Sequence, residues 1–100
     1  MNRKLNQQQL EFYRYIHNLL LTKWDPCGVK GVREARDEYD SYTAIVFSRA
    51  LSGERAEEIA QFLLYVEQEL MGLGGARKLC LSVAEQIVMQ RNSLINDNHA

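Results

Sequence analysis

Apolar residues recur every three or four positions along four stretches of this chain, the spacing that lines one face of an α-helix. We expect the first helix to run from about Leu5 to Thr22. It should end before Pro26, because proline lacks a backbone N–H and pushes the preceding residue out of the helical region. The predicted apolar face of this helix comprises Phe12, Tyr13, Ile16, Leu19 and Leu20.

Two further helices are predicted on either side of residue 51. Acidic side chains favour a first helical turn, so the second helix should begin within residues 37–40 and extend to about Ala50. Ser52 is a good N-cap for the third helix, which should end near Leu70, before the glycines that follow it. The third helix has the most regular apolar stripe of the sequence: Ala56, Ile59, Ala60, Leu63, Val66 and Leu70.

A fourth helix is expected from Ala76 to about Arg91, followed by a polar tail, 92–100, that should fray like the first few residues. No strand-like alternation competes with these helices. We therefore predict an all-α protein, a compact bundle of about four helices forming one domain over 1–100. One long ordered connector should join the first helix to the second.

Composition fits this picture and narrows the class of protein. The chain has 100 residues, 46% of them hydrophobic and 25% charged, as in an ordinary globular domain. A net charge of -1 gives no overall attraction to nucleic acid or to an anionic membrane, and no apolar run is long enough to span a bilayer. Two cysteines, Cys27 and Cys80, make no disulfide framework, so we expect a cytoplasmic protein with reduced thiols.

The predicted connector between the first two helices collects unusual residues. It holds the only Trp and the only Pro of the chain, in the run Trp24-Asp25-Pro26-Cys27-Gly28-Val29. We expect Trp24 to plug the open end of the bundle, while Pro26 and Gly28 fix the turn. Asp25 has two interpretations: it accepts backbone N–H groups within the turn, or it faces a ligand.

The residues that could carry catalysis or bind a metal are scattered. The histidines and cysteines show no CxxC or HxxxH spacing, so neither a metal nor a cofactor is expected. Cys27 with His17 is the one available nucleophile and base, and Cys80 belongs to the apolar face of the fourth helix. Acids separate the arginines at 33 and 36 from the tyrosines behind them, which disfavours direct nucleic-acid binding. We predict that the chain is not an enzyme.

Protein binding is better supported. Residues 54–69 hold five acids and one arginine, a local excess that the net charge conceals. This excess has two interpretations, a solvated helix face or a surface complementary to a basic partner. The predicted contact residues are acids and tyrosines of two segments: Asp37, Glu38, Tyr39, Asp40 and Tyr42, then Glu54, Glu57, Glu58 and Tyr65.

Three motifs in order also resemble the pattern of a group of small bacterial helical proteins, which share WDPIGV, DEYD.Y and E.E.MGL. Here they read Trp24-Asp25-Pro26-x-Gly28-Val29, Asp37-Glu38-Tyr39-Asp40-x-Tyr42 and Glu67-x-Glu69-x-Met71-Gly72-Leu73, and the resemblance covers roughly residues 10–73. Cys27 stands where the pattern usually has an aliphatic residue, which argues against thiol chemistry there. Some members of the group look like immunity proteins of bacterial toxin–immunity systems, including those of contact-dependent growth inhibition.

The resemblance implies a binding function. Our leading hypothesis is an immunity protein that occludes the active site of a cognate toxin, a basic nuclease being the kind of toxin that an acidic surface fits. The competing hypothesis is a small-ligand-binding or regulatory module, in which Asp25 and the acidic segment line a pocket beside the bundle.

Overall fold

The structure, a computed structural model, describes the backbone of residues 5–24 and 33–98 and the side chains of 5–24 and 39–94. No strand occurs in these ranges, so the all-α prediction is confirmed. The elements, in chain order, are α1 (Gln7–Leu19), the π-helical turn η1 (Leu20–Trp24), α2 (Arg33–Leu51), α3 (Ala56–Tyr65), the π-helical turn η2 (Val66–Leu70) and α4 (Arg77–Asn98).

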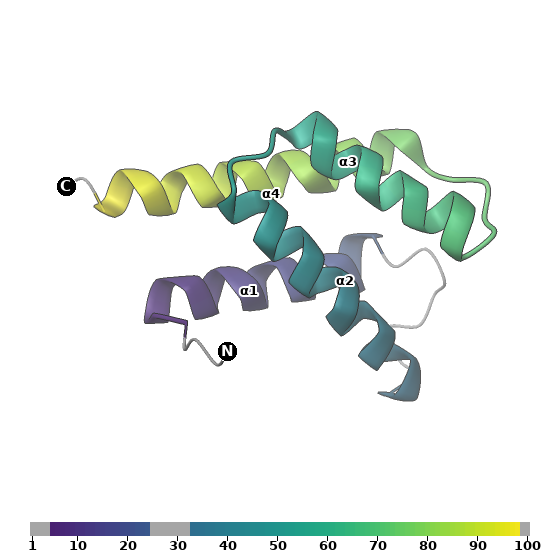
Figure 1. Ribbon diagram of the computed structural model, residues 1–100, viewed down its shortest axis with the longest axis horizontal. Coiled ribbons are helices and arrows are strands. Elements are labelled where there is room, and N and C mark those ends of the chain that lie inside the picture. Colours follow the sequence, from purple (N-terminus) through teal and green to yellow (C-terminus); the bar gives the residue numbers. More distant parts are fainter. Residues whose placement is uncertain (1–4, 25–32, 99–100) are drawn as a thin grey trace.

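The helices form an open bundle in which α4 is the longest element (Figure 1). α3 lies along α4 and runs in the opposite direction, and this pair has the most extensive contact between helices. α1 also runs opposite to α4, so the start of α1 and the end of α4 lie at the same end of the molecule, while α2 crosses α1 steeply (Figure 1). None of the described helices has the length and apolar content to cross a membrane.

A single hydrophobic cluster joins all the elements. The predicted apolar faces supply most of it, because side chains three or four residues apart on a helix point the same way. Its members with no exposed side-chain surface are Ile16, Leu20, Val46, Ala50, Ile59, Leu63, Val66, Val83, Ala84 and Ile87. Cys80, 1% exposed, is also in this core, as predicted.

The first helix ends differently from the prediction. α1 begins with a reciprocal cap, in which Gln9 N–H donates to Asn6 Oδ1 at 2.7 Å and Asn6 N–H donates to Gln9 Oε1 at 3.0 Å. It then widens into η1 and continues to Trp24, beyond the predicted end at Thr22. All three apolar side chains of this π turn, those of Leu20, Leu21 and Trp24, are buried in the core.

The predicted starts of the second and third helices were wrong. α2 begins at Arg33, one turn before the acidic run, because residues 33–36 are good helix formers themselves. Ser52 does not cap α3: its hydroxyl donates to the carbonyl of Arg49 at 2.8 Å and so belongs to the end of α2. Gly53 turns the chain with φ of 94°, and α3 starts at Ala56.

The end of the chain is more helical than expected. The third helical segment ends at Leu70, as predicted, and α4 starts at Arg77, one residue after the predicted start. The predicted end near Arg91 and the frayed tail were wrong for residues 92–98, which continue α4. Leu94 packs against the core, and this contact stabilises the extra turns.

Candidate partner-binding surface

The aromatic residues of the first two motifs meet inside the molecule. The ring centroid of Trp24 lies 5.6 Å from that of Tyr39 and 6.2 Å from that of Tyr42, and the two tyrosine rings are 6.1 Å apart. Trp24 is 2% exposed and Tyr39 1% exposed. The interpretation of Tyr39 as a surface contact residue is therefore corrected: its ring fills the core beside Trp24. Tyr42 is half-buried against the same cluster.

Asp40 lies at the edge of this cluster and is tied to α1. His17 Nδ1 lies 3.3 Å from Asp40 Oδ1 and 3.2 Å from Thr43 Oγ1. The Thr43 hydroxyl donates to the carbonyl of Tyr39 at 2.7 Å, so in its contact with His17 the hydroxyl oxygen is the hydrogen-bond acceptor. Asp40 remains 58% exposed, and its carboxylate faces both solvent and the imidazole. Burial, and secondarily the nearby Asp40 carboxylate, raises the pKa of Tyr13.

Several residues singled out from the sequence cannot be placed. Asp25, Pro26, Cys27 and Gly28 lie outside the described residues, and so do the side chains of Asp37 and Glu38. The proposed roles of the turn, and the pocket that Asp25 was expected to line, stay predictions.

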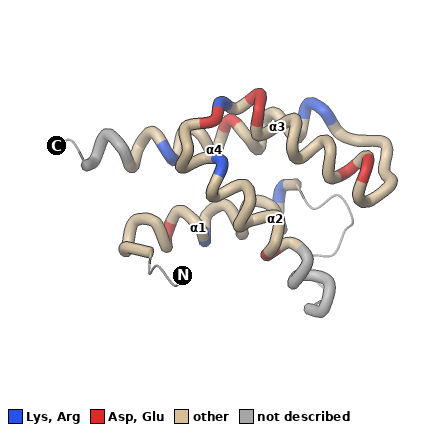
Figure 2. The backbone as a smooth tube through the Cα atoms, viewed as in Figure 1, with Lys and Arg blue, Asp and Glu red and all other residues tan. Residues whose placement is uncertain are grey.

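The acids of the second predicted segment lie at the start of α3, but they are not a uniform negative patch. Glu54 pairs with Arg49, whose Nη1 lies 3.1 Å from Oε1, and Glu58 lies 3.7 Å from Arg55. Figure 2 shows acidic and basic residues alternating along this part of the chain. Glu57 is exposed and has no basic partner within the described part of the chain. Arginines thus pair with two of the five acids counted along the sequence, and Glu57 keeps its charge unpaired within the described residues.

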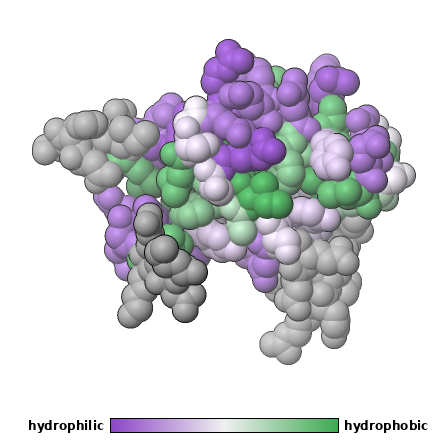
Figure 3. All heavy atoms as spheres, in the orientation of Figure 1, coloured by the Kyte–Doolittle hydropathy of each residue, from purple (hydrophilic) through white to green (hydrophobic). Residues whose placement is uncertain are grey.

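The outer face of α3 also carries a shallow hollow, which we call the Tyr65 hollow. It has a volume of about 370 Å³ and is lined by Arg49, Glu58, Gln61, Phe62 and Tyr65. Tyr65 is 50% exposed, and the guanidinium carbon of Arg49 lies 4.8 Å from the centroid of the Phe62 ring. Figure 3 shows hydrophilic side chains gathered over α3 above a more hydrophobic band across the same face.

One acid of the third motif is buried, which the count of acids along the sequence did not reveal. Glu67 is 4% exposed. Its Oε2 accepts a hydrogen bond from the Cys80 thiol at 2.7 Å and lies 3.5 Å from the amide nitrogen of Ala76. A signal was present, because Glu67 follows Leu63 by four residues and so shares the apolar face of the helix. Glu67 therefore joins η2 to α4 inside the core and does not belong to the surface.

This buried contact also determines the chemistry of the second cysteine. Burial, then the hydrogen bond to Glu67 and the charge of its carboxylate, raise the pKa of the Cys80 thiol to about 12. The Trp24 indole N–H, which meets no acceptor at standard hydrogen-bond geometry among the described residues, faces the sulfur and offsets part of this rise. Cys80 is therefore a protonated, unreactive thiol at neutral pH. Within the described residues, no three His, Cys, Asp or Glu side chains gather in a group able to hold a metal ion.

Comparison with known proteins identifies no relative: no family model, no curated protein and no solved structure matches this chain.

Proposed function

We propose that this chain is a cytoplasmic immunity protein that binds a cognate bacterial toxin, a basic nuclease, and occludes its active site. The observation that carries the proposal is the Tyr65 hollow, where a half-exposed tyrosine stands beside Phe62, Glu58 and Arg49 on an outward helix face. Tyrosine and arginine are the residue types that contribute most to binding at protein interfaces. The resemblance of the three sequence motifs to small bacterial immunity-like proteins supports the same function.

The geometry refines which residues should matter. Glu57 is an exposed acid of α3 that has no ion pair with any described residue, so its charge is available to a basic partner. Glu54 and Glu58 already have arginine partners. Asp40 is exposed on α2 and is a second candidate. We therefore expect Tyr65 to be the anchor of the complex, and Glu57 and Asp40 to act chiefly by attracting the toxin from a distance.

The test is binding of the toxin domain encoded beside this gene, with its affinity measured by isothermal titration calorimetry and its nuclease activity assayed in parallel. Tyr65→Ala should weaken binding at least about 30-fold, the loss typical of an anchor side chain. Glu57→Lys should slow association and make the rate less sensitive to salt, because it removes an attractive charge.

A matched control is Met89→Ala, which removes a 71% exposed side chain from α4 and should leave the affinity unchanged. If Tyr65→Ala and Glu57→Lys both bind as wild type does, the outer face of α3 is not the contact surface. If the neighbouring gene encodes no toxin and no purified nuclease toxin is inhibited, the immunity function itself is wrong.

A further inference from the structure

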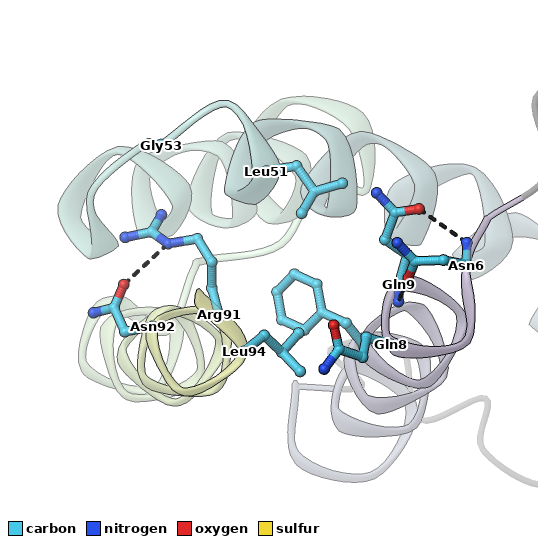
Figure 4. A pocket seen from close by; sticks show the side chains of 9 residues that line it. Asn6, Gln8, Gln9, Leu51, Gly53, Arg91, Asn92 and Leu94 are labelled. Atoms are coloured by element: carbon cyan, nitrogen blue, oxygen red, sulfur yellow. Dashed lines mark hydrogen bonds between the residues drawn. The ribbon is translucent and has the colours of Figure 1, made fainter. Parts of the chain in front are cut away.

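A second cavity lies at the end of α2, away from the aromatic cluster near its start. The start of α1, the end of α2 and the last turns of α4 come together there (Figure 4). It has a volume of about 280 Å³, just below the usual range for drug-sized ligands, so it suits a small molecule. Its lining is Asn6, Gln8, Gln9, Phe12, Leu51, Gly53, Arg91, Asn92 and Leu94.

The centre of this cavity is apolar. Phe12, Leu51 and Leu94 line it from three different helices. Figure 4 shows Leu51 and Leu94 on two sides of it and the methylene stem of Arg91 at its border. Leu51 is 45% exposed and supplies exposed apolar surface here, whereas Phe12 is already 1% exposed in the absence of a ligand. A ligand with an aromatic or aliphatic body would remove this surface from water, which is the main source of affinity in small sites.

Arg91 gives the cavity its charge. Its Nη1 donates to the backbone carbonyls of Ala50, at 3.2 Å, and of Glu54, and its Nε donates to Asn92 Oδ1 at 3.3 Å. All three acceptors are neutral oxygens, and Arg91 has no ion pair among the described residues. None of the residues that line the cavity is acidic. The positive charge is thus held in place but not neutralised.

Such an arginine favours an anionic ligand. The contacts at Ala50, Glu54 and Asn92 fix the guanidinium before binding, so little side-chain entropy is lost when a carboxylate pairs with it. Gln8 lies on the opposite wall and makes no side-chain hydrogen bond within the described residues, so its amide can bind a polar group of the ligand.

We propose that this cavity binds a small amphipathic carboxylate, with its apolar body against Phe12, Leu51 and Leu94 and its carboxylate paired with Arg91. The site is separate from the Tyr65 hollow and shares no residue with it, so it does not depend on the immunity function.

The test uses phenylacetate and the uncharged analogue 2-phenylethanol as probes, each titrated into the 15N-labelled protein and followed by NMR. We expect saturable shifts of the backbone amides of Gln8, Leu51 and Leu94 with phenylacetate. 2-Phenylethanol should bind about tenfold more weakly or worse, because it lacks the charge-assisted hydrogen bond to Arg91.

Two variants separate the body of the ligand from its charge. Leu51→Trp fills the cavity and should abolish the shifts, whereas Met89→Trp, at an exposed position of α4, should retain them. Arg91→Gln should weaken the binding of phenylacetate about tenfold and leave the affinity for 2-phenylethanol unchanged. Arg91 also binds a carbonyl at the end of α2, so Arg91→Gln could prevent folding. In that case Leu51→Trp and the comparison of the two probes still test the proposal.

Three results would overturn the proposal. They are no saturable shift with phenylacetate, the same shifts in Leu51→Trp as in wild type, and equal affinity for the charged and uncharged probes.

Discussion

Glu67 is a carboxylate enclosed by the core, and its value to the fold lies in its hydrogen bonds. Its carboxylate accepts a hydrogen bond from the Cys80 thiol and lies within hydrogen-bonding reach of the Ala76 amide. Its backbone carbonyl accepts a hydrogen bond from the Leu73 amide at 2.8 Å. A buried carboxylate is tolerated only where such partners replace water. The residue thereby fixes the chain between η2 and α4 and holds Cys80 in its protonated form.

The raised pKa of Cys80 predicts a loss of stability in alkali. Below about pH 8.5 the thiol is protonated whether the chain is folded or unfolded, so it adds no pH dependence. Between that pH and about 12 the unfolded thiol ionises while the folded one does not, so the free energy of unfolding should fall by up to about 1.4 kcal/mol per pH unit. Urea denaturation at several alkaline pH values measures this slope.

Cys80→Ser is the matched variant, because its hydroxyl still donates to Glu67 but does not titrate in this range. The slope should become shallower in Cys80→Ser. Tyr13→Phe is the control for the raised pKa of Tyr13, and it should leave the part of the slope below pH 10 unchanged. If the free energy of unfolding falls with pH equally steeply in wild type and in Cys80→Ser, the prediction is contradicted.

At the level of elements, the chain uses wide turns and positive-φ glycines to end its helices. Gly72 and Gly75 have φ of 70° and 90° in the segment between η2 and α4. Their surroundings differ: a Cβ on Gly75 would lie 2.7 Å from Leu64 Cδ1 and 2.9 Å from Gln68 Nε2, whereas nothing lies within 4 Å of one on Gly72. Gln68 is itself engaged, since it donates to the carbonyl of Gly74 at 3.1 Å.

This difference predicts unequal effects of the same substitution. Gly72→Ala should cost only the backbone strain of a positive φ, about 1 kcal/mol of the free energy of unfolding. Gly75→Ala adds the displacement of Leu64 and Gln68 and should cost about 2 kcal/mol or more. Urea denaturation measures the free energy of unfolding of each variant. Equal decreases in the two variants would show that the close contacts at Gly75 relax without cost.

On the scale of the whole molecule, one core holds all the elements together. Trp24, the only tryptophan of the chain, contacts Tyr39 and Tyr42 of α2 and faces Cys80 of α4. Its fluorescence should therefore report the loss of packing among η1, α2 and α4. We expect the thermal transition followed by Trp24 fluorescence to coincide with that followed by circular dichroism of the helices, as in two-state unfolding. A separate, earlier fluorescence transition would mean that η1 detaches before the α3–α4 pair unfolds.

The sequence by itself determined the helical class, most of the four apolar faces and the burial of Cys80. Leu70 was wrongly placed on the third apolar face, because it lies in η2 and is 55% exposed. These features depend on local periodicity, which any helix converts directly into a face. The helix boundaries were less accurate, because they depend on caps and turns such as Ser52 and Gly53, whose side chains and backbone serve the end of α2 as well as the start of α3.

Only the tertiary structure decided which polar residues are available at the surface. Tyr39 and Glu67 were counted from the sequence as surface groups, but helices from elsewhere in the chain cover them. Arg49, close to Glu54 across a turn, and Arg91, distant in sequence from Ala50, found their partners only through folding. Burial and pairing of a side chain depend on what lies opposite it in space, and no local pattern records that.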